Sequence, residues 1–188
     1  CCPTRITEDK PPQNLSVYAV SKYAVERMAL LYGHALEIPT VTLRYFSAYG
    51  PRQSLENPYS GVSAIFLRRI MSGEPPRVFE DGRQLRDFVY VLDIARANAL
   101  ALEIGEETDC YNIGSGVPVS ILDLANCLSN LTGIRLEPCI TKEFRLGDTR
   151  SDFADISKAT RALGFKPHWT LKQGLEELVK WAMGTWKR

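Results

Sequence analysis

Residues 17–46 join a helical segment to a β-branched run, and this succession limits the possible folds sharply. Apolar residues recur every three or four positions between 17 and 37, and Pro39 closes the segment. These apolar positions are Val17, Val20, Ala24, Met28, Leu31 and Ala35. The run TVTLRYF, residues 40–46, is typical of a buried strand. A helix followed by a buried strand predicts a parallel α/β sheet.

The rest of the chain continues this alternation. Residues 1–16 are rich in proline and polar side chains, which favours an extended or irregular segment. Further helices are predicted over about 61–72, 92–104, 120–132, 155–163 and 171–186, and strands at 110–113 and 135–141. Residues 77–91 indicate two short strands joined at Asp81-Gly82, a dipeptide common in tight hairpins. The 188 residues suit one α/β domain, or one domain plus part of another.

Composition excludes several classes of function. The 23 Lys and Arg residues nearly balance 22 Asp and Glu residues, so there is no broad basic surface for nucleic acid or anionic lipid. No apolar run approaches the roughly 18 residues of a membrane span. Five cysteines make a poor disulfide framework, which favours reduced thiols and a cytoplasmic setting. With two histidines and no CxxC pair, no metal site is expected.

Tyr18 and Lys22 form the most chemically suggestive pair. In SVYAVSKYAVE they stand four residues apart, which puts both side chains on one face of the predicted helix. An ammonium beside a phenol stabilises the phenolate, and a tyrosine tuned in this way can exchange a proton with a sugar hydroxyl. The spacing alone also fits a helix with one exposed lysine and one half-buried tyrosine.

Longer segments carry a family resemblance. PPQNLSVYAVSKYAVERMALLYG, VTLRYFSAYGPRQ, FEDGRQLRDFVYVLDIARANALAL and YNIGSG occur in this order. Together they resemble the extended short-chain dehydrogenase/reductase family of NAD-dependent nucleotide-sugar epimerases and dehydratases. RQSLENPYSG, PPRVFEDGRQLRDFV and RLGDTRSDFADISKA are most similar to the dTDP-L-rhamnose 4-epimerase type, followed by UDP-glucose 4-epimerases.

The resemblance implies a fold and a domain division. The chain would be the C-terminal part of a Rossmann-type doubly wound sheet plus a small α/β nucleotide-sugar-binding subdomain. Residues 1–50, with the YxxxK motif, would be the remnant of the NAD-binding domain. Residues 51–188 would mainly bind the nucleotide sugar, with about 92–113 returning to the Rossmann sheet.

The resemblance also implies a reaction. Tyr18 would be the acid–base that takes the 4-hydroxyl proton while carbon 4 of the sugar gives a hydride to NAD. The 4-keto sugar would then turn and be reduced on its other face. Lys22 would also hold the nicotinamide ribose, and Tyr45 and Phe46 would pass beside the nicotinamide. The family's RYFN is RYFS here, so the phosphate contact of its Asn falls to Ser47, which reaches less far.

The remaining implied site residues would bind the nucleotide diphosphate sugar. Gln84 and Arg86 match positions that grip the ribose and diphosphate, and an arginine fork suits a diphosphate. The strand that flanks the base would supply Arg77, Val78 and Phe79, and the C-terminal RLGDTR would supply Arg145 and Asp148. Full-length members commonly dimerise through the YxxxK helix, so the resemblance also implies a homodimer.

Other features are read more plainly. The chain contains no glycine-rich NAD loop, and the segment from Gly114 to Gly116 is interpreted as the YNIGSG turn rather than such a loop. We therefore expect a fragment that neither binds NAD tightly nor turns over substrate by itself. The three tryptophans are expected to pack in the core. Cys1 and Cys2 are either ordinary thiols or the remnant of a zinc-binding insertion.

Alternatives stay open at this stage. A nucleotide-sugar 4,6-dehydratase and a UDP-glucuronate decarboxylase share the same family features. A catalytically silent nucleotide-sugar-binding module is a different class, although such a module would not need the Tyr18–Lys22 pair.

Overall fold

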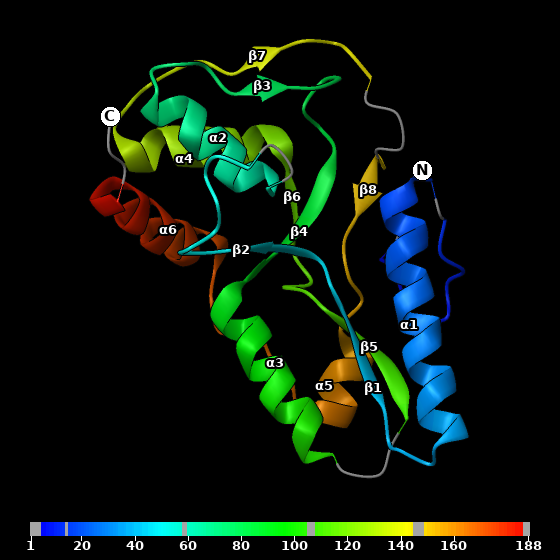
Figure 1. Cartoon of the computed structure of the whole chain (residues 1–188). Helices are drawn as coiled ribbons and strands as arrows, with labels where there is room; N and C mark the ends of the chain where they lie inside the picture. Colours follow the sequence, from blue (N-terminus) through cyan, green and yellow to red (C-terminus); the bar gives the residue numbers. More distant parts are fainter. Residues whose placement is uncertain (1–4, 14, 58–59, 105–107, 145–148, 186–188) are drawn as a thin grey trace.

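The computed structural model describes residues 5–13, 15–57, 60–104, 108–144 and 149–185 (Figure 1). The helices are α1 (Val17–Ala35), α2 (Val62–Met71), α3 (Val91–Glu103), α4 (Ile121–Thr132), α5 (Ser157–Leu163) and α6 (Leu171–Thr185). The strands are β1 (Val41–Tyr45), β2 (Ser47–Tyr49), β3 (Arg77–Val78), β4 (Leu85–Tyr90), β5 (Asp109–Ile113), β6 (Pro118–Ser120), β7 (Cys139–Ile140) and β8 (Ser151–Asp152). The helices therefore lie close to their predicted positions.

Parallel pairing dominates the strands. In the described chain β1 pairs with β5, β2 and β8 each pair with β4, and β3 pairs with β7, all parallel. Only β6 runs antiparallel to β4. The predicted α/β class is confirmed, and it matches the Rossmann-type arrangement of a mainly parallel sheet with flanking helices.

The predicted hairpin over residues 77–91 is wrong. The turn itself exists, with Gly82 at φ +75° and its N–H donating to the carbonyl of Phe79. However, β3 pairs with β7 and β4 pairs with β2, β6 and β8, so the two arms never pair with each other. The predicted strand at 135–141 shortens to Cys139–Ile140. The strand at 40–46 is half-buried rather than buried, because β5 is its only strand partner among the described residues.

Two cores hold the chain together. One lies between α2, α4, α6 and β4, and its fully buried members include Leu67, Leu124 and Leu178. The other lies between α3, α5 and β5, and includes Phe165 and Tyr111. The aligned apolar faces of these amphipathic helices supply most of the buried surface.

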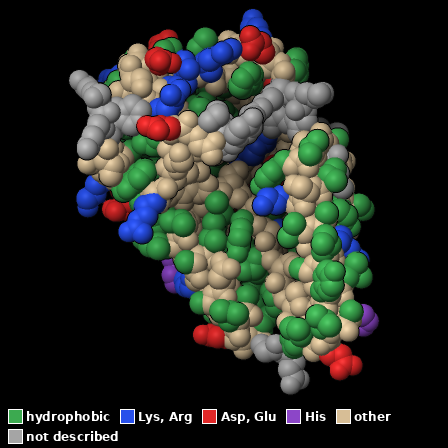
Figure 2. Space-filling view, in the orientation of Figure 1, with side chains coloured by type: hydrophobic (Ala, Val, Ile, Leu, Met, Phe, Trp, Pro, Cys, Tyr) green, Lys and Arg blue, Asp and Glu red, His purple; other side chains and the backbone are tan. Residues whose placement is uncertain are grey.

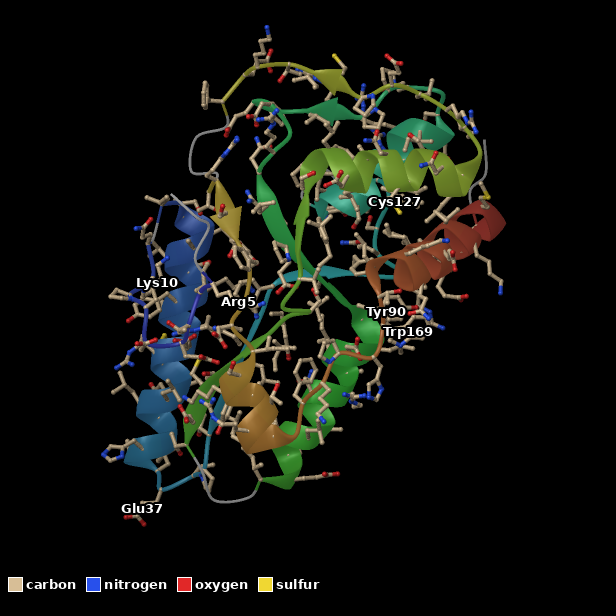
Figure 3. The ribbon with its side chains drawn as sticks, turned by 180° about the vertical axis from the view of Figure 1, so that it is seen from behind. Arg5, Lys10, Glu37, Tyr90, Cys127 and Trp169 are labelled. Atoms are coloured by element: carbon tan, nitrogen blue, oxygen red, sulfur yellow. The ribbon has the colours of Figure 1, made fainter. Side chains whose placement is uncertain are left out.

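Tyr90 and Trp169 join α3 to the segment that leads into α6. Their ring centroids are 4.4 Å apart, and Figure 3 shows the two side chains against each other at this junction. Asp93, 2% exposed, accepts hydrogen bonds from the backbone N–H groups of His168 and Trp169. Trp169 and Trp181 pack against the first core, as expected, whereas Trp186 lies outside the described residues.

Helix α1 is covered on one side only. Ser16 caps it, because its hydroxyl accepts from the N–H of Ala19, and this sets the helix start at Val17. The side toward β1 carries Tyr23, Glu26 and Gly33, and Gly33 is its only buried residue. The periodic apolar positions that predicted the helix lie on the opposite side. Figure 2 shows this exposed hydrophobic stripe along α1, to which Val17, Val20, Met28 and Leu31 belong.

Candidate functional site

A cavity of about 380 Å³ opens between α2, β2 and the start of β4. It is lined by Ser47, Ser60, Val62, Ile65, Phe66, Arg69, Arg77, Phe79, Gln84, Arg86 and Ile121. Five residues predicted to bind substrate therefore meet there, although they come from three separate parts of the sequence: Ser47, Arg77, Phe79, Gln84 and Arg86.

Among the described residues, one predicted substrate residue does not line this cavity. Val78 is 0% exposed in the first core, because side chains along a strand alternate and its neighbours Arg77 and Phe79 take the cavity side. The structure therefore gives Val78 a packing position in the first core, and its contact with the substrate stays a prediction. Arg145 and Asp148 lie outside the described residues.

Gln84 presents an unsatisfied acceptor at the cavity. Its side chain is 2% exposed, and its Nε2 donates to the carbonyl oxygen of Phe79 at 3.0 Å. Its Oε1 is buried without a hydrogen-bond partner in the described chain. A buried acceptor left unpaired costs roughly 1–3 kcal/mol.

The polar lining is cationic. Arg69 pairs with Glu74 at 3.1 Å, and Arg77 pairs with Glu143 at 3.1 Å, while Arg86 Nη1 donates to the carbonyl oxygen of Leu85 at 2.8 Å. No Asp or Glu is among the lining residues described. Three guanidinium groups beside an apolar wall suit an anionic ligand with a flat ring, since arginine binds phosphate oxygens in a bidentate manner.

An ion-pair network fixes the turn that carries Gln84. Arg150 donates to both carboxylate oxygens of Asp81, at 2.7 and 2.8 Å, and to Glu80 at 3.0 Å. The N–H of Arg83 adds a bond to Asp81 at 2.9 Å. The hydrogen bonds from the Arg150 guanidinium, and after them the bond from the Arg83 N–H, hold the pKa of the Asp81 carboxyl well below its usual range. The turn therefore has a defined shape at neutral pH.

The wall of the cavity was missed by sequence reasoning. Val62, Ile65, Phe66 and Arg69 stand at positions i, i+3, i+4 and i+7 of α2, so one helix face supplies all four. That spacing, with an arginine at its end, was available in the sequence. Ser60 and Ile121 carried no comparable signal.

Tyr18 and Lys22 lie together on an open side of α1. The Lys22 Nζ is 5.6 Å from the centroid of the Tyr18 ring, and 70% of Tyr18 is exposed. The predicted shared face is confirmed. Neither residue belongs to the cavity lining, so the proton-transfer pair and the anion-binding groups occupy separate elements.

The segment after β1 connects these two elements. Tyr45 ends β1, and its hydroxyl donates to Oδ1 of Asn98 at 2.8 Å. Phe46 is half-buried, and its N–H donates to the carbonyl oxygen of Ile113. Ser47 begins β2 and lines the cavity. Three consecutive residues thus run from the strand under α1 to the cavity.

The turn at 114–116 serves the protein's own carboxylate. Asp87 is 0% exposed and accepts from the N–H and hydroxyl of Ser115, both at 2.6 Å, and from the N–H groups of Gly116 and Ala154. A Cβ added at Gly114 would lie 2.5 Å from Asp87 Oδ2. The N–H groups of Ser115 and Gly116 are therefore occupied by Asp87, as expected for a structural turn.

Two absences concern the described residues alone. They contain no group of three or more His, Cys, Asp and Glu side chains placed to hold a metal ion. None of their helices combines the length and apolar character needed to cross a membrane. Cys110, Cys127 and Cys139 are free thiols, whereas Cys1 and Cys2 fall outside this part of the chain.

Comparison with known proteins places this geometry in context. A family model described as the NAD dependent epimerase/dehydratase family matches residues 3–114. The dTDP-L-rhamnose 4-epimerase of Burkholderia thailandensis is 37% identical over 171 residues, which are 90% of this chain and 47% of that protein. UDP-glucuronate 4-epimerase 2 of Arabidopsis thaliana is 31% identical over an alignment of 197 positions, which covers 96% of this chain and 44% of that protein.

Solved structures give the same result. UDP-glucose 4-epimerase of Thermotoga maritima, solved with UDP-glucose, matches with a TM-score of 0.89 and 36% identity over 97% of this chain and 58% of that one. UDP-glucuronic acid 4-epimerase of Bacillus cereus, in complex with UDP-glucuronic acid and NAD, matches with a TM-score of 0.87 and 32% identity. The match covers 97% of this chain and 57% of that one. The chain thus spans about half the length of the proteins it matches.

Proposed function

Because the chain belongs to the NAD-dependent epimerase/dehydratase family, we propose that it forms the substrate-binding and proton-transferring part of a nucleotide-sugar 4-epimerase. The observation that carries this proposal is the cavity, which combines three guanidinium groups, an apolar wall and the unpaired Oε1 of Gln84. The names of the relatives, which are 4-epimerases of UDP- and dTDP-sugars, agree with it.

In this proposal the cavity binds the nucleotide diphosphate. Arg86 and Arg77 donate to diphosphate oxygens, Phe79 lies against the base, and Gln84 accepts a hydrogen bond from the nucleoside. Ser47 donates to a phosphate oxygen. Holding the ligand at the nucleotide end leaves the hexose free to turn, which inversion at carbon 4 requires.

Tyr18 moves the proton. Its phenolate accepts the proton of the 4-hydroxyl when carbon 4 is oxidised, and the same phenol returns it when carbon 4 is reduced. Lys22 stands beside it on the same helix, with its ammonium 5.6 Å from the centroid of the Tyr18 ring. Both groups are open to an approaching ligand, because α1 is uncovered on this side.

The residues of α1 and β1 fit the nicotinamide end of NAD. Lys22 would hold the nicotinamide ribose, and Tyr45 and Phe46 would lie along the ring. When bound, NAD supplies the hydride acceptor for carbon 4. The 188 residues include no glycine-rich loop at a helix N-terminus, so we expect this polypeptide alone to bind NAD weakly and to show no turnover. Epimerase activity from the isolated chain would contradict this expectation.

The homodimer belongs to the same proposal. The exposed apolar stripe of α1, defined by Val17, Val20, Met28 and Leu31, supports pairing with a second copy. Sedimentation of Leu31→Glu should then show a monomer where the unaltered protein is a dimer. An unchanged dimer would place the interface elsewhere.

The reaction is tested by incubating the complete enzyme that contains this chain with NAD and a panel of UDP-, dTDP- and GDP-sugars. NMR of the products distinguishes the family's reactions. Inverted carbon 4 with oxygen kept at carbon 6 is expected. A 4-keto-6-deoxy product would indicate a dehydratase, loss of carbon dioxide a decarboxylase, and no conversion a binding module.

A further inference from the structure

A bidentate ion pair attaches α1 to β1. Arg44 Nε lies 2.7 Å from Glu26 Oε2, and Arg44 Nη2 lies 2.6 Å from Glu26 Oε1. The two side chains are 28% and 14% exposed. Arg44 Nη1 also donates to the carbonyl oxygen of Glu8 at 3.0 Å. Because the guanidinium is planar and all three nitrogens are engaged, the pair fixes direction as well as distance.

Glu26 stands on the row that carries the proton-transfer pair. Tyr18, Lys22 and Glu26 are four residues apart, so their side chains follow one another along α1. The helix has a second close attachment at its other end. There the Ile38 N–H donates to the Gly33 carbonyl oxygen at 2.8 Å, and a Cβ on Gly33 would collide with Thr40.

Two attachments define the axis of a helix that has little apolar packing. Glu26 lies eight residues from Tyr18, or about 12 Å, and Gly33 lies about 22 Å away. With only the Gly33 attachment left, a tilt of about 5° would move Tyr18 by roughly 2 Å. Displacements of about 1 Å can lower a rate about 100-fold. The ion pair therefore controls a distance to which the chemistry is sensitive.

We propose that Glu26 and Arg44 are positioning residues, whose ion pair aims Tyr18 and Lys22 at the reacting carbon of the sugar bound in the cavity. Arg44 directly precedes Tyr45, Phe46 and Ser47, the segment that leads into the cavity. One side chain thus couples the orientation of the helix to the strand that reaches the substrate. This inference rests on the proposed function for its catalytic consequence, but its structural part stands apart from it.

The structural part is tested on the 188-residue chain by hydrogen–deuterium exchange. Both variants keep a side chain of similar length. Glu26→Gln removes the negative charge, and Arg44→Lys replaces the planar guanidinium with an ammonium that cannot form the bidentate pair. Exchange over residues 17–25 should become at least tenfold faster in both variants, with α2 and α4 unchanged. The control is Glu176→Gln, which weakens the ion pair of Glu176 with Lys172 at 3.9 Å on α6 and should leave exchange in α1 unchanged.

Unchanged exchange in α1, or equal acceleration in every helix, would overturn the proposal, since the pair would then be dispensable or merely stabilising.

The catalytic part is measured on the complete enzyme with NAD. Both variants should lower kcat about 30- to 100-fold with KM for the nucleotide sugar within threefold, whereas Glu176→Gln should keep kcat. A raised KM with kcat retained would contradict a positioning role. If the unaltered enzyme converts no sugar, the proposed function fails, and exchange still decides whether the pair positions α1.

Discussion

The cavity region and the α1 region are built from the same kinds of element but are held in different ways. Here the cavity region means α2, β3, β4, α4 and α6, and the α1 region means α1, β1 and β5. Helices α2 and α6 each bury five residues, whereas α1 buries only Gly33. The groups proposed to bind substrate therefore stand on a packed support. The proton-transfer pair stands on a helix held by a narrow contact and one directional ion pair.

Substrate binding and proton transfer therefore place opposite demands on the packing of the elements that carry them. A cavity keeps its shape through dense packing around its walls. A helix that must meet a cofactor and a substrate needs an open side, so its orientation has to come from a few directional contacts.

The largest effect is expected at Tyr18. Tyr18→Phe removes the hydroxyl that transfers the proton but leaves the ring in place. In the complete enzyme with NAD, kcat should fall about 100- to 10,000-fold. The Kd for the nucleotide sugar should stay within twofold, because the cavity is untouched. A parallel loss of affinity in isothermal titration would break the division between the two regions.

The next largest effect is expected from truncating apolar side chains, which should cost more stability in the cavity region than in the α1 region. Leu128→Ala, at a fully buried position of α4, should destabilise the protein by about 2–5 kcal/mol. Met28→Ala, at a position 55% exposed on α1 of the single chain, should change the stability of the monomer by less than about 0.5 kcal/mol. Urea unfolding of the two variants provides the comparison. Similar costs at protein concentrations that keep the chain monomeric would mean that another part of the chain covers the outer stripe of α1.

The ion pair adds a pH dependence that belongs to the α1 region. The Arg44 guanidinium, by hydrogen bonding, lowers the pKa of the Glu26 carboxyl below its ordinary value. Ionised Glu26 thus contributes stability above its unfolded pKa of about 4.3, and this is lost as pH falls through the lower folded value. Compared with Glu26→Gln, the unaltered protein should be more stable by about 1.5–3 kcal/mol near pH 7. The difference should shrink below about pH 4, and a constant difference would rule out the carboxylate as its source.

The smallest effect concerns Ser47. The resembling family has Asn at this position, and Asn reaches farther than Ser with an amide donor. Ser47→Asn should therefore lower the Kd for the nucleotide sugar by about two- to tenfold, the value of one added hydrogen bond. Titration calorimetry measures it. A weaker Kd would indicate that the cavity is shaped around the shorter side chain.

The spacing of apolar residues predicted the positions of the helices well, but it did not predict which elements pack against them. The spacing of Val17, Val20 and Met28 correctly indicated a helix, yet those residues face away from β1. Apolar spacing identifies a stripe but not what covers it. The Asp81-Gly82 turn was also found correctly, but pairing of β3 with β7 across some sixty residues leaves no mark in either segment. The short strands β2, β6 and β8 are set by β4 and have no periodicity of their own.

The candidate site shows the same limit. Motif positions selected Arg86 and Gln84 from many polar residues, and both line the cavity. Val78 was included because it belongs to the same motif, although strand alternation turns it into the core. Arg69 was missed although it ends the i, i+3, i+4, i+7 face of α2, because that spacing does not show which parts of the chain the face meets.

Recognition of the nucleotide sugar by the cavity region is tested by calorimetric titration of the 188-residue chain itself with UDP-glucose. Saturable binding is predicted, weakened at least tenfold by Arg86→Ala and unchanged by Tyr18→Phe. Arg135→Ala is the matched control, since Arg135 is exposed and is not among the cavity-lining residues. Absence of binding to UDP-glucose and to dTDP-glucose, or equal weakening by Arg135→Ala, would contradict the claim that the cavity region alone recognises the nucleotide sugar.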